Sequence, residues 1–242
     1  MTTVAIIPAR GGSKGIPRKN LRRVAGRSLV GWSVLAGLEA ELVDEVVVSS
    51  DSAEILEEAV RCGAKPLQRP DELATDEAST DDVLMHAMNA LGWKHDVVVT
   101  LQPTVPIREP WLVDAAIRRL IESGADSVHT CEEGNHHFFW KQVERKRHNG
   151  EPVGMVWVQC NARGLRIPRQ AFKTNDFQYP EDGAVTATRA KFLATARERL
   201  AHRSGIASVL LHARTIDIDT EADLRDAEGM MMARLGVLTA VS

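Results

Sequence analysis

Short apolar runs alternate with amphipathic segments along most of the chain. Val4–Pro8, Glu45–Ser50 and Asp96–Leu101 each have the length and composition of a buried β-strand. Between such runs, apolar residues recur at helical spacing, most clearly within Ser28–Glu39 and Glu109–Glu122. This alternation predicts an α/β fold with a mostly parallel sheet and helices on both faces.

The same pattern extends to the C-terminal part, with one interruption. We expect further strands at Lys65–Leu67, Asp126–Cys131, Val185–Thr188, Ala207–Leu211 and Thr215–Ile218, and further helices at Ser52–Arg61, from Ser79, at Arg189–Arg197 and from Thr220. Between about 136 and 179 the pattern breaks, and Asn149-Gly150, a hairpin signal, lies among strand-like fragments. We therefore expect a single domain over 1–242 with a β-rich inserted subdomain at 136–179, serving as an oligomer interface or a substrate lid.

Composition and charge narrow the possible functions. The 242 residues are 44% hydrophobic and 26% charged, which is ordinary for a globular protein with a sizeable core. The net charge of −3 argues against a general nucleic-acid binder. The first 38 residues nevertheless hold seven Lys or Arg and no Asp or Glu. A local cation cluster on an acidic protein indicates a site for a compact anion.

Other features bear on the compartment. The three cysteines lie far apart and form no CxxC pattern, which argues against disulfides and a zinc cage. The N-terminus shows no signal-peptide pattern, and no apolar run approaches the ~20 residues that span a bilayer. We expect a cytoplasmic protein without a membrane partner.

The densest candidate site is the segment 9–20, ARGGSKGIPRKN, which follows the first expected strand. Glycines let the backbone approach a ligand closely, and cations neutralise phosphate charge. The segment is not a Walker A loop, because Ile16 follows Gly15, and it lacks the dinucleotide-binding G-x-G-x-x-G. The alternative is a solvated basic turn. We interpret the segment as a phosphate-binding loop.

Two aspartates form the second candidate site. In a strand, Asp217 and Asp219 would share one face and converge on a hard cation such as Mg²⁺. The alternative is a helix start, in which Asp219 or Thr220 caps the last helix and the acids of 221–223 complement its dipole. Taken alone, the two interpretations are about equally good. The basic glycine-rich loop favours the metal site.

Several motifs together resemble those of the acylneuraminate cytidylyltransferase (CMP-sialic acid synthetase) family. They occur in the family's order: ARGGSKGIPRKN at 9–20, VVVSSDS at 46–52, LQRPDELATDEAST at 67–80, LQPTVPIR at 101–108, DGA at 182–184 and IDIDTEADL at 216–224. The resemblance implies a Rossmann-like nucleotide-diphospho-sugar transferase fold and a homodimer built through the inserted segment. It also implies a Mg²⁺-dependent transfer of CMP from CTP to a sugar acid, with release of pyrophosphate.

The resemblance further implies roles for single residues. Arg10, Lys19, Asp217 and Asp219 would be catalytic, and the two aspartates would hold Mg²⁺. The nucleotide and sugar-acid contacts would come from Gly11, Gly12, Ser13, Lys14, Asn20, Asp51, Arg69, Ser79, Gln102 and Arg108. More ordinary roles compete with some of these. Arg69 and Arg108 could be surface charges, and Asp51 and Ser79 could only cap helices.

Two positions on the sugar side depart from the family pattern. Val105 stands where serine is usual, and Asp182 replaces an asparagine and adds a negative charge near the expected sugar pocket. The expected acceptor is a nonulosonic acid such as sialic, legionaminic or pseudaminic acid. One alternative is a related nucleotidyltransferase with an octulosonate or phosphonate acceptor or another base. The other is an inactive nucleotide-binding regulatory relative.

Overall fold

The computed structural model describes residues 1–109, 111–132, 140–146, 152–159, 181–201, 205–212 and 215–236. The chain divides into two compact units. One comprises Met1–Glu132 with Glu181–Ser242, and the other comprises Glu133–Pro180. The insertion expected at 136–179 lies within the second unit.

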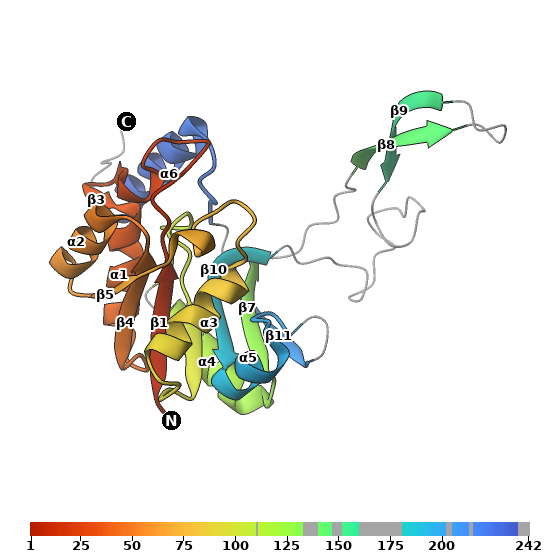
Figure 1. Cartoon of the computed structure of the whole chain (residues 1–242). Helices are drawn as coiled ribbons and strands as arrows, with labels where there is room; N and C mark the ends of the chain where they lie inside the picture. The colour runs from red at the N-terminus through yellow and green to blue at the C-terminus, as the bar shows by residue number, and fades with distance from the viewer. Residues whose placement is uncertain are drawn as a thin grey trace. The chain divides into compact units, whose positions relative to one another are not determined.

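A seven-stranded sheet forms the centre of the larger unit, in the order β11-β7-β10-β6-β1-β4-β5 (Figure 1). Its strands are β1 (Thr3–Pro8), β4 (Glu45–Ser50), β5 (Lys65–Gln68), β6 (Val97–Thr100), β7 (Ser127–Glu132), β10 (Glu181–Arg189) and β11 (Ala207–His212). Within this sheet β10 runs antiparallel to β6 and β7, and every other pair is parallel. The prediction of a mostly parallel sheet is confirmed.

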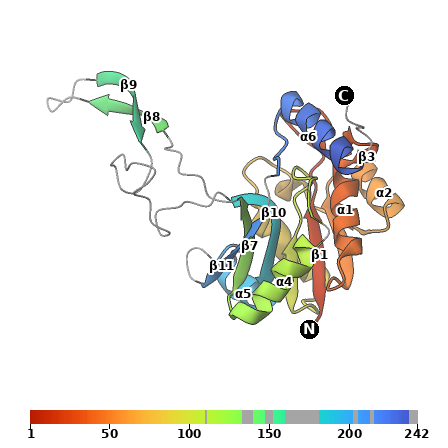
Figure 2. The ribbon, with the colours of Figure 1, turned by 180° about the vertical axis from the view of Figure 1, so that it is seen from behind.

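Helices cover both faces of the sheet, as Figures 1 and 2 show from opposite sides. One face carries α1 (Leu29–Glu39), α2 (Ala53–Arg61) and α4 (Leu112–Ser123), and the other carries α3 (Thr80–Ala90) and α5 (Ala190–Ala196). None of the described helices is long and apolar enough to cross a membrane.

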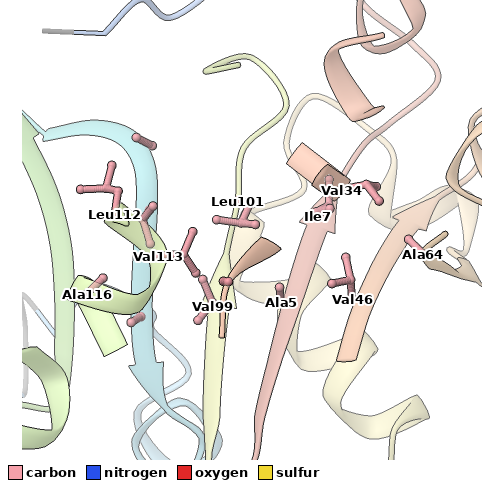
Figure 3. Close-up of a cluster of buried hydrophobic side chains, with 14 of the residues drawn as sticks. Ala5, Ile7, Val34, Val46, Ala64, Val99, Leu101, Leu112, Val113 and Ala116 are labelled. Carbon is pink, nitrogen blue, oxygen red and sulfur yellow. The ribbon is translucent and has the colours of Figure 1, made fainter. Parts of the chain in front are cut away.

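Side chains along β1 show why its sequence is continuously apolar. Ala5 and Ile7 pack into the core on the α1 side (Figure 3), whereas Val4 and Ile6 pack into the core on the α3 side. All four are fully buried. A strand covered on both faces has no solvent side, so its residues do not alternate between apolar and polar. Full burial of a Val or Ile side chain stabilises the fold by roughly 1.5–3 kcal/mol.

The strand expected at Thr215–Ile218 is wrong, because the described residues 215–219 form no strand. Ile218 is instead fully buried in a third apolar cluster, together with Ile16, Leu29 and residues of α6 (Glu221–Arg234). Its amide donates to the Thr104 carbonyl at 2.8 Å. A buried side chain and one backbone hydrogen bond therefore hold this segment in place of a strand ladder.

Short elements complete the larger unit, namely η1 (Lys19–Leu21), the two-stranded sheet of β2 (Arg23–Val24) and β3 (Arg27–Ser28), and η2 (Asp71–Leu73). In the smaller unit, β8 (Trp140–Lys146) pairs antiparallel with β9 (Pro152–Gln159). The turn predicted at Asn149-Gly150 lies outside the described residues, as does most of 136–179. The role of this insertion as an interface or lid stays a prediction.

Candidate active site

A pocket of about 300 Å³ opens where β1, β5 and β6 end. Open α/β sheets present their ligand sites at this carboxyl edge. Several residues predicted from the sequence line the pocket together: Arg10, Gly12, Ser13, Lys19, Asn20, Arg69 and Gln102. The tertiary structure thus brings the glycine-rich loop, the segment after β5 and the segment after β6 to one cavity.

The glycine-rich loop is shaped by contacts on its protein side. The Gly11 amide donates to the Asp51 carboxylate at 2.9 Å, and a Cβ on Gly11 would lie only 2.9 Å from the Cβ of Ser52. Asn20 is buried, and its side-chain amide donates to the Arg10 carbonyl at 2.8 Å. Asp51 and Asn20 therefore hold the loop backbone. Their contacts with a nucleotide stay predictions.

Each cation predicted to bind phosphate has an acidic partner from a distant segment. Arg10 pairs with Asp76 at 2.7 Å, and Lys14 pairs with the other oxygen of the same carboxylate. Lys19 lies 3.1 Å from Asp219, and its ammonium donates to the Ile218 carbonyl at 2.7 Å. The pairs of Arg10 and Lys14 are exposed, and exposed ion pairs contribute only about 0–1 kcal/mol, so a phosphate can displace the carboxylate of Asp76.

The start of α6 separates the two interpretations of the acidic segment. Thr220 is the helix N-cap and forms a capping box with Asp223, so the expectation that Thr220 could cap this helix is confirmed. Asp219 takes no part in that cap through its side chain, which is 76% exposed and faces Lys19. Capping by Thr220 therefore leaves the Asp219 carboxylate available to a ligand.

The surroundings of Asp217 favour a bound cation. Its pKa is raised, chiefly because neighbouring atoms displace water, and also because Asp219 and Asp223 are negative. A hydrogen bond with Thr104 and the charge of Lys19 act in the opposite direction. Carboxylates that repel each other in this way are stabilised by a cation between them.

The carboxylates of Asp217 and Asp219 suit magnesium better than a metal ion whose ligands all come from the protein. Among the described residues, no three His, Cys, Asp or Glu side chains gather into a metal site. Magnesium commonly takes one or two carboxylates and completes its shell with phosphate oxygens and water. Asp217, which shares a hydrogen bond with the pocket residue Thr104, and Asp219, which pairs with Lys19, provide two such carboxylates. Asp217 and Asp219 therefore suit an ion that arrives with a phosphorylated ligand.

Arg69 is not a surface charge, because only 4% of its surface is exposed. Its guanidinium donates to the carbonyls of Leu73 at 3.1 Å and Ser49 at 2.8 Å, while its Nε makes no hydrogen bond in the described structure. Burial lowers its pKa, and the negative charge of Asp51 opposes that shift. Arg69 thus forms a fixed, charged wall of the pocket.

Arg108 lies outside the lining of this pocket and is also buried rather than exposed. It donates to the Ala184 carbonyl at 2.6 Å, to the Ser33 hydroxyl at 3.0 Å and to the Gln102 carbonyl. Burial lowers the pKa of Arg108 to about 9, against the opposing effect of Asp182. Its contacts fix the main chain of Ala184 and that of the pocket residue Gln102. A contact with the sugar carboxylate stays a prediction.

Ser79 caps α3, as the simpler alternative proposed. Its hydroxyl accepts from the Asp82 amide at 3.0 Å and donates to the Asp82 carboxylate at 2.7 Å. Both functions of the hydroxyl are therefore used within the helix start. Ala78 and Thr80 on either side line the pocket, whereas Ser79 does not.

We expect Ser79→Ala to lower the free energy of unfolding by about 1 kcal/mol, the usual contribution of an N-cap side chain. The KM for a nucleotide substrate should change less than about threefold, since the hydroxyl is committed to the cap. Urea unfolding and initial rates would measure the two effects. Ser79→Thr keeps the capping hydroxyl and should retain most of the stability. A large rise in KM with little loss of stability would instead identify Ser79 as a nucleotide contact.

Asp182 does not place a free negative charge in the pocket. Its side chain is 4% exposed, and one oxygen lies 2.5 Å from the His212 imidazole. The other oxygen accepts from Thr130 at 2.7 Å and from the Ala184 amide at 2.8 Å. Burial by itself would raise the pKa of Asp182, but these hydrogen bonds hold it below the ordinary value. Val105, the other departure, is fully buried in the core.

Asp182 should make stability depend on acid pH. The pKa of an aspartate in an unfolded chain is about 3.9. Because the folded-state pKa of Asp182 is lower, its ionised form stabilises the fold above that pH, and the contribution is lost as the pH falls through the lowered pKa. Asp182→Asn should therefore cost roughly 1–3 kcal/mol at neutral pH and progressively less below about pH 4. Urea unfolding across this range tests the expectation. A difference that does not vary with pH would contradict it.

Four polar residues that line the pocket were not singled out from the sequence, namely Thr75, Asp76, Thr80 and Thr104. All of them lie inside the motif segments 67–80 and 101–108. Small polar residues in a loop look alike in sequence, so only their position beside the glycine-rich loop distinguishes them. Asp76 is the most informative, because it contacts two of the predicted phosphate-binding cations.

Comparison with known proteins agrees with this geometry. A family model described as cytidylyltransferase matches residues 4–150. The CMP-N,N'-diacetyllegionaminic acid synthase of Legionella pneumophila is 30% identical over 248 residues, which cover 96% of this chain and 97% of that protein. N-acylneuraminate cytidylyltransferase A of Danio rerio is 36% identical over 141 residues, or 58% of this chain. Those residues span only 32% of the Danio rerio protein.

The fold of this chain is also similar to that of a solved structure. CMP:2-keto-3-deoxy-manno-octonic acid synthetase complexed with CTP aligns with 97% of this chain at a TM-score of 0.70 and 19% identity. At that identity the match shows a shared fold, which confirms the predicted nucleotidyltransferase-type α/β architecture. Because the family model covers more than half of the sequence and the Legionella relative aligns along nearly all of it, this chain belongs to the cytidylyltransferase family.

Proposed function

We propose that this protein transfers CMP from CTP to a nonulosonic acid and releases pyrophosphate, with Mg²⁺ as cofactor. One observation carries the proposal. Arg10, Lys19 and Arg69 line a single pocket of about 300 Å³, Asp217 shares a hydrogen bond with the pocket residue Thr104, and Asp219 pairs with Lys19. Three cations in one pocket, beside two carboxylates that can share a metal ion, suit a nucleoside triphosphate.

The reaction requires little covalent chemistry from the protein. A hydroxyl of the acceptor attacks the α-phosphorus of CTP and loses its proton, and the bond from that phosphorus to the bridging oxygen breaks. Pyrophosphate departs with the electron pair of that bond. The protein has to align the two substrates and stabilise charge on the phosphate oxygens.

The residues of the pocket can divide this work. Lys19 is held by the Ile218 carbonyl and Asp219, so its ammonium is already oriented when a triphosphate enters. The amides and the Ser13 hydroxyl of the glycine-rich loop can donate to phosphate oxygens. Asp217 and Asp219 would hold Mg²⁺. When bound, the ion would neutralise phosphate charge and polarise the α-phosphoryl group.

Gln102 is the best candidate for a contact with the acceptor. It lines the pocket with Pro103 and Thr104, and a Cβ on Gly183 would lie 3.4 Å from its amide nitrogen. An amide suits a ligand rich in hydroxyls that carries a carboxylate. The two relatives named above act, by their names, on a legionaminic acid and an N-acylneuraminate. These names support a nonulosonic acid as the acceptor.

The proposal is tested by measuring pyrophosphate release with Mg²⁺ and CTP. The acceptor panel comprises sialic, legionaminic and pseudaminic acids, 3-deoxy-manno-octulosonate and simple phosphonates, and it is repeated with ATP, GTP and UTP. Release with CTP and one nonulosonic acid is the expected result. Release with an octulosonate, a phosphonate or another base would replace the proposed substrate pair. CTP binding without release on any acceptor would favour an inactive regulatory relative.

The homodimer and the cytoplasmic location are parts of the same proposal. The insertion 133–180 forms a separate compact unit that includes the β8–β9 pair, which supports an interface role. Sedimentation equilibrium of the full chain and of a variant shortened within the insertion would measure its contribution to assembly.

A further inference from the structure

A carboxylate lies among the cations of the pocket. Asp76 follows η2 and lines the cavity. One of its oxygens accepts from the Arg10 guanidinium at 2.7 Å, and the other pairs with the Lys14 ammonium. Both cations belong to the glycine-rich loop, far from Asp76 in the sequence. A single side chain thus neutralises two of the groups expected to bind phosphate.

The backbone around Asp76 is held by other side chains. The Thr75 hydroxyl accepts from the Ala78 amide at 3.2 Å, and Ser79 caps the helix that follows. Asp76 is directed instead at the loop cations, and its side chain remains 39% exposed. Hydrogen bonds from Lys14 and Arg10 hold its pKa below the ordinary value, so it is ionised at neutral pH.

The charge of Asp76 opposes the expected ligand. Among the described residues that line the pocket, Arg10, Lys19 and Arg69 are cationic and Asp76 is the one carboxylate. A carboxylate and a phosphate offer the same anionic oxygens to an arginine or a lysine. The two anions must therefore compete for Arg10 and Lys14. Because the ion pairs are exposed, their exchange costs little.

We propose that Asp76 is an internal counter-ion, which competes with the phosphates of the nucleotide and thereby sets the affinity of this pocket for phosphate anions. The inference rests on the proposed function only in taking Arg10 and Lys14 as phosphate-binding groups. In the ligand-free protein, Asp76 neutralises the two cations. When a triphosphate binds, the cations exchange the carboxylate for phosphate. When pyrophosphate leaves, Asp76 pairs with them again, which speeds the release of this product.

If Asp76 helped phosphate binding instead of competing with it, the change in phosphate affinity on its removal would have the opposite sign. If Asp76 only oriented Arg10 and Lys14 toward the ligand, its removal would weaken phosphate binding. Competition predicts that its removal strengthens binding. A purely structural residue would lower stability and would not tighten a ligand.

Asp76→Asn keeps the shape of the side chain and removes its charge. Isothermal titration of the full chain with inorganic pyrophosphate, and separately with CTP, measures binding without an acceptor and therefore without turnover. We expect both dissociation constants to fall about three- to tenfold, the range for the loss of one or two exposed ion pairs. The difference should shrink at high salt, where exposed charges are screened.

Glu77→Gln is the matched control. It removes the same charge from the neighbouring residue, which is exposed and does not line the pocket. Its dissociation constants should stay within about 1.5-fold of the wild-type values, since screening weakens longer-range effects. Thermal unfolding of Asp76→Asn should match the wild type closely.

Each outcome decides the proposal. Tighter binding of both anions by Asp76→Asn, with Glu77→Gln unchanged, supports it. Unchanged or weaker binding overturns it, as does an equal gain in both variants. If pyrophosphate and CTP bind but no acceptor yields CMP transfer, the proposed reaction fails while the competition stands. If neither anion binds the wild type, both proposals fail.

Discussion

Asp217→Asn is expected to lower the rate of pyrophosphate release by about 10²–10³-fold or more, the range seen when a group that stabilises the transition state is lost. The variant keeps the size and hydrogen-bonding shape of the side chain, so Thr104 can retain its contact. It removes one of the two charges proposed to hold Mg²⁺. The Mg²⁺ concentration needed for half-maximal rate should rise at the same time.

Two controls, a measurement of stability and a substitution of another aspartate, show whether the effect is specific to Asp217. Part of Asp217 is exposed, and neighbouring atoms around the rest disfavour its charge, so Asp217→Asn should leave the free energy of unfolding unchanged or raise it by less than about 0.5 kcal/mol. Asp226→Asn changes an exposed aspartate within α6 and should leave both the rate and the Mg²⁺ response unaltered. A rate for Asp217→Asn equal to that of the wild type would exclude the metal-binding role of this residue.

Gly15→Ala should have a comparably large effect through packing alone. A Cβ at this position would lie 2.6 Å from the main-chain oxygen of Asp219, and a backbone atom cannot move aside as a flexible side chain does. The glycine-rich loop and the acidic segment must then separate. We expect a loss of roughly 1–3 kcal/mol of stability, as for other overpacked sites. Turnover should fall about 10²-fold, because misplacement by ~1 Å is enough for such a loss.

Two other glycines provide controls for this experiment. A Cβ on Gly12 would meet no atom within 4 Å, so Gly12→Ala should retain stability although it lies in the same loop. Gly229→Ala, within α6 and equally free of contacts, should stabilise the protein by about 0.5–1 kcal/mol without affecting turnover. Thermal unfolding and initial rates would be measured for all three variants. Equal behaviour of Gly15→Ala and Gly12→Ala would contradict the close contact with Asp219.

Local signals in the sequence predicted local structure well. Ser79 caps α3 by accepting from the Asp82 amide at 3.0 Å, and Thr220 caps α6. Both signals act over three residues, so the sequence contains all that the cap requires. The apolar runs of β1, β4 and β6 likewise identified the central strands. The place of the glycine-rich loop at the end of β1 followed from their order.

The burial of single side chains and the pairing of strands by segments distant in sequence could not be predicted in this way. Arg69 and Arg108 could each have been surface charges, but both are buried by segments distant in sequence. The pattern of Thr215–Ile218 alternates as a strand does. No neighbouring strand pairs with it in the described structure, and Ile218 packs into the cluster beside α6 instead. Alternation alone does not make a strand, because a strand also needs a partner, and Thr215 is buried although it is one of the polar residues of the pattern.

The charged residues of the N-terminal segment show most clearly what the sequence determined and what the tertiary structure decided. By itself, the sequence determined an α/β fold, a glycine-rich loop after the first strand and a cluster of cations without an acid nearby in the chain. Tertiary structure alone decided that Asp76, Glu54, Asp219 and Glu221 pair with these cations. Secondary structure depends on contacts among near neighbours, which a sequence displays. The electrostatics of a pocket depend on residues that folding brings together from up to 200 positions apart.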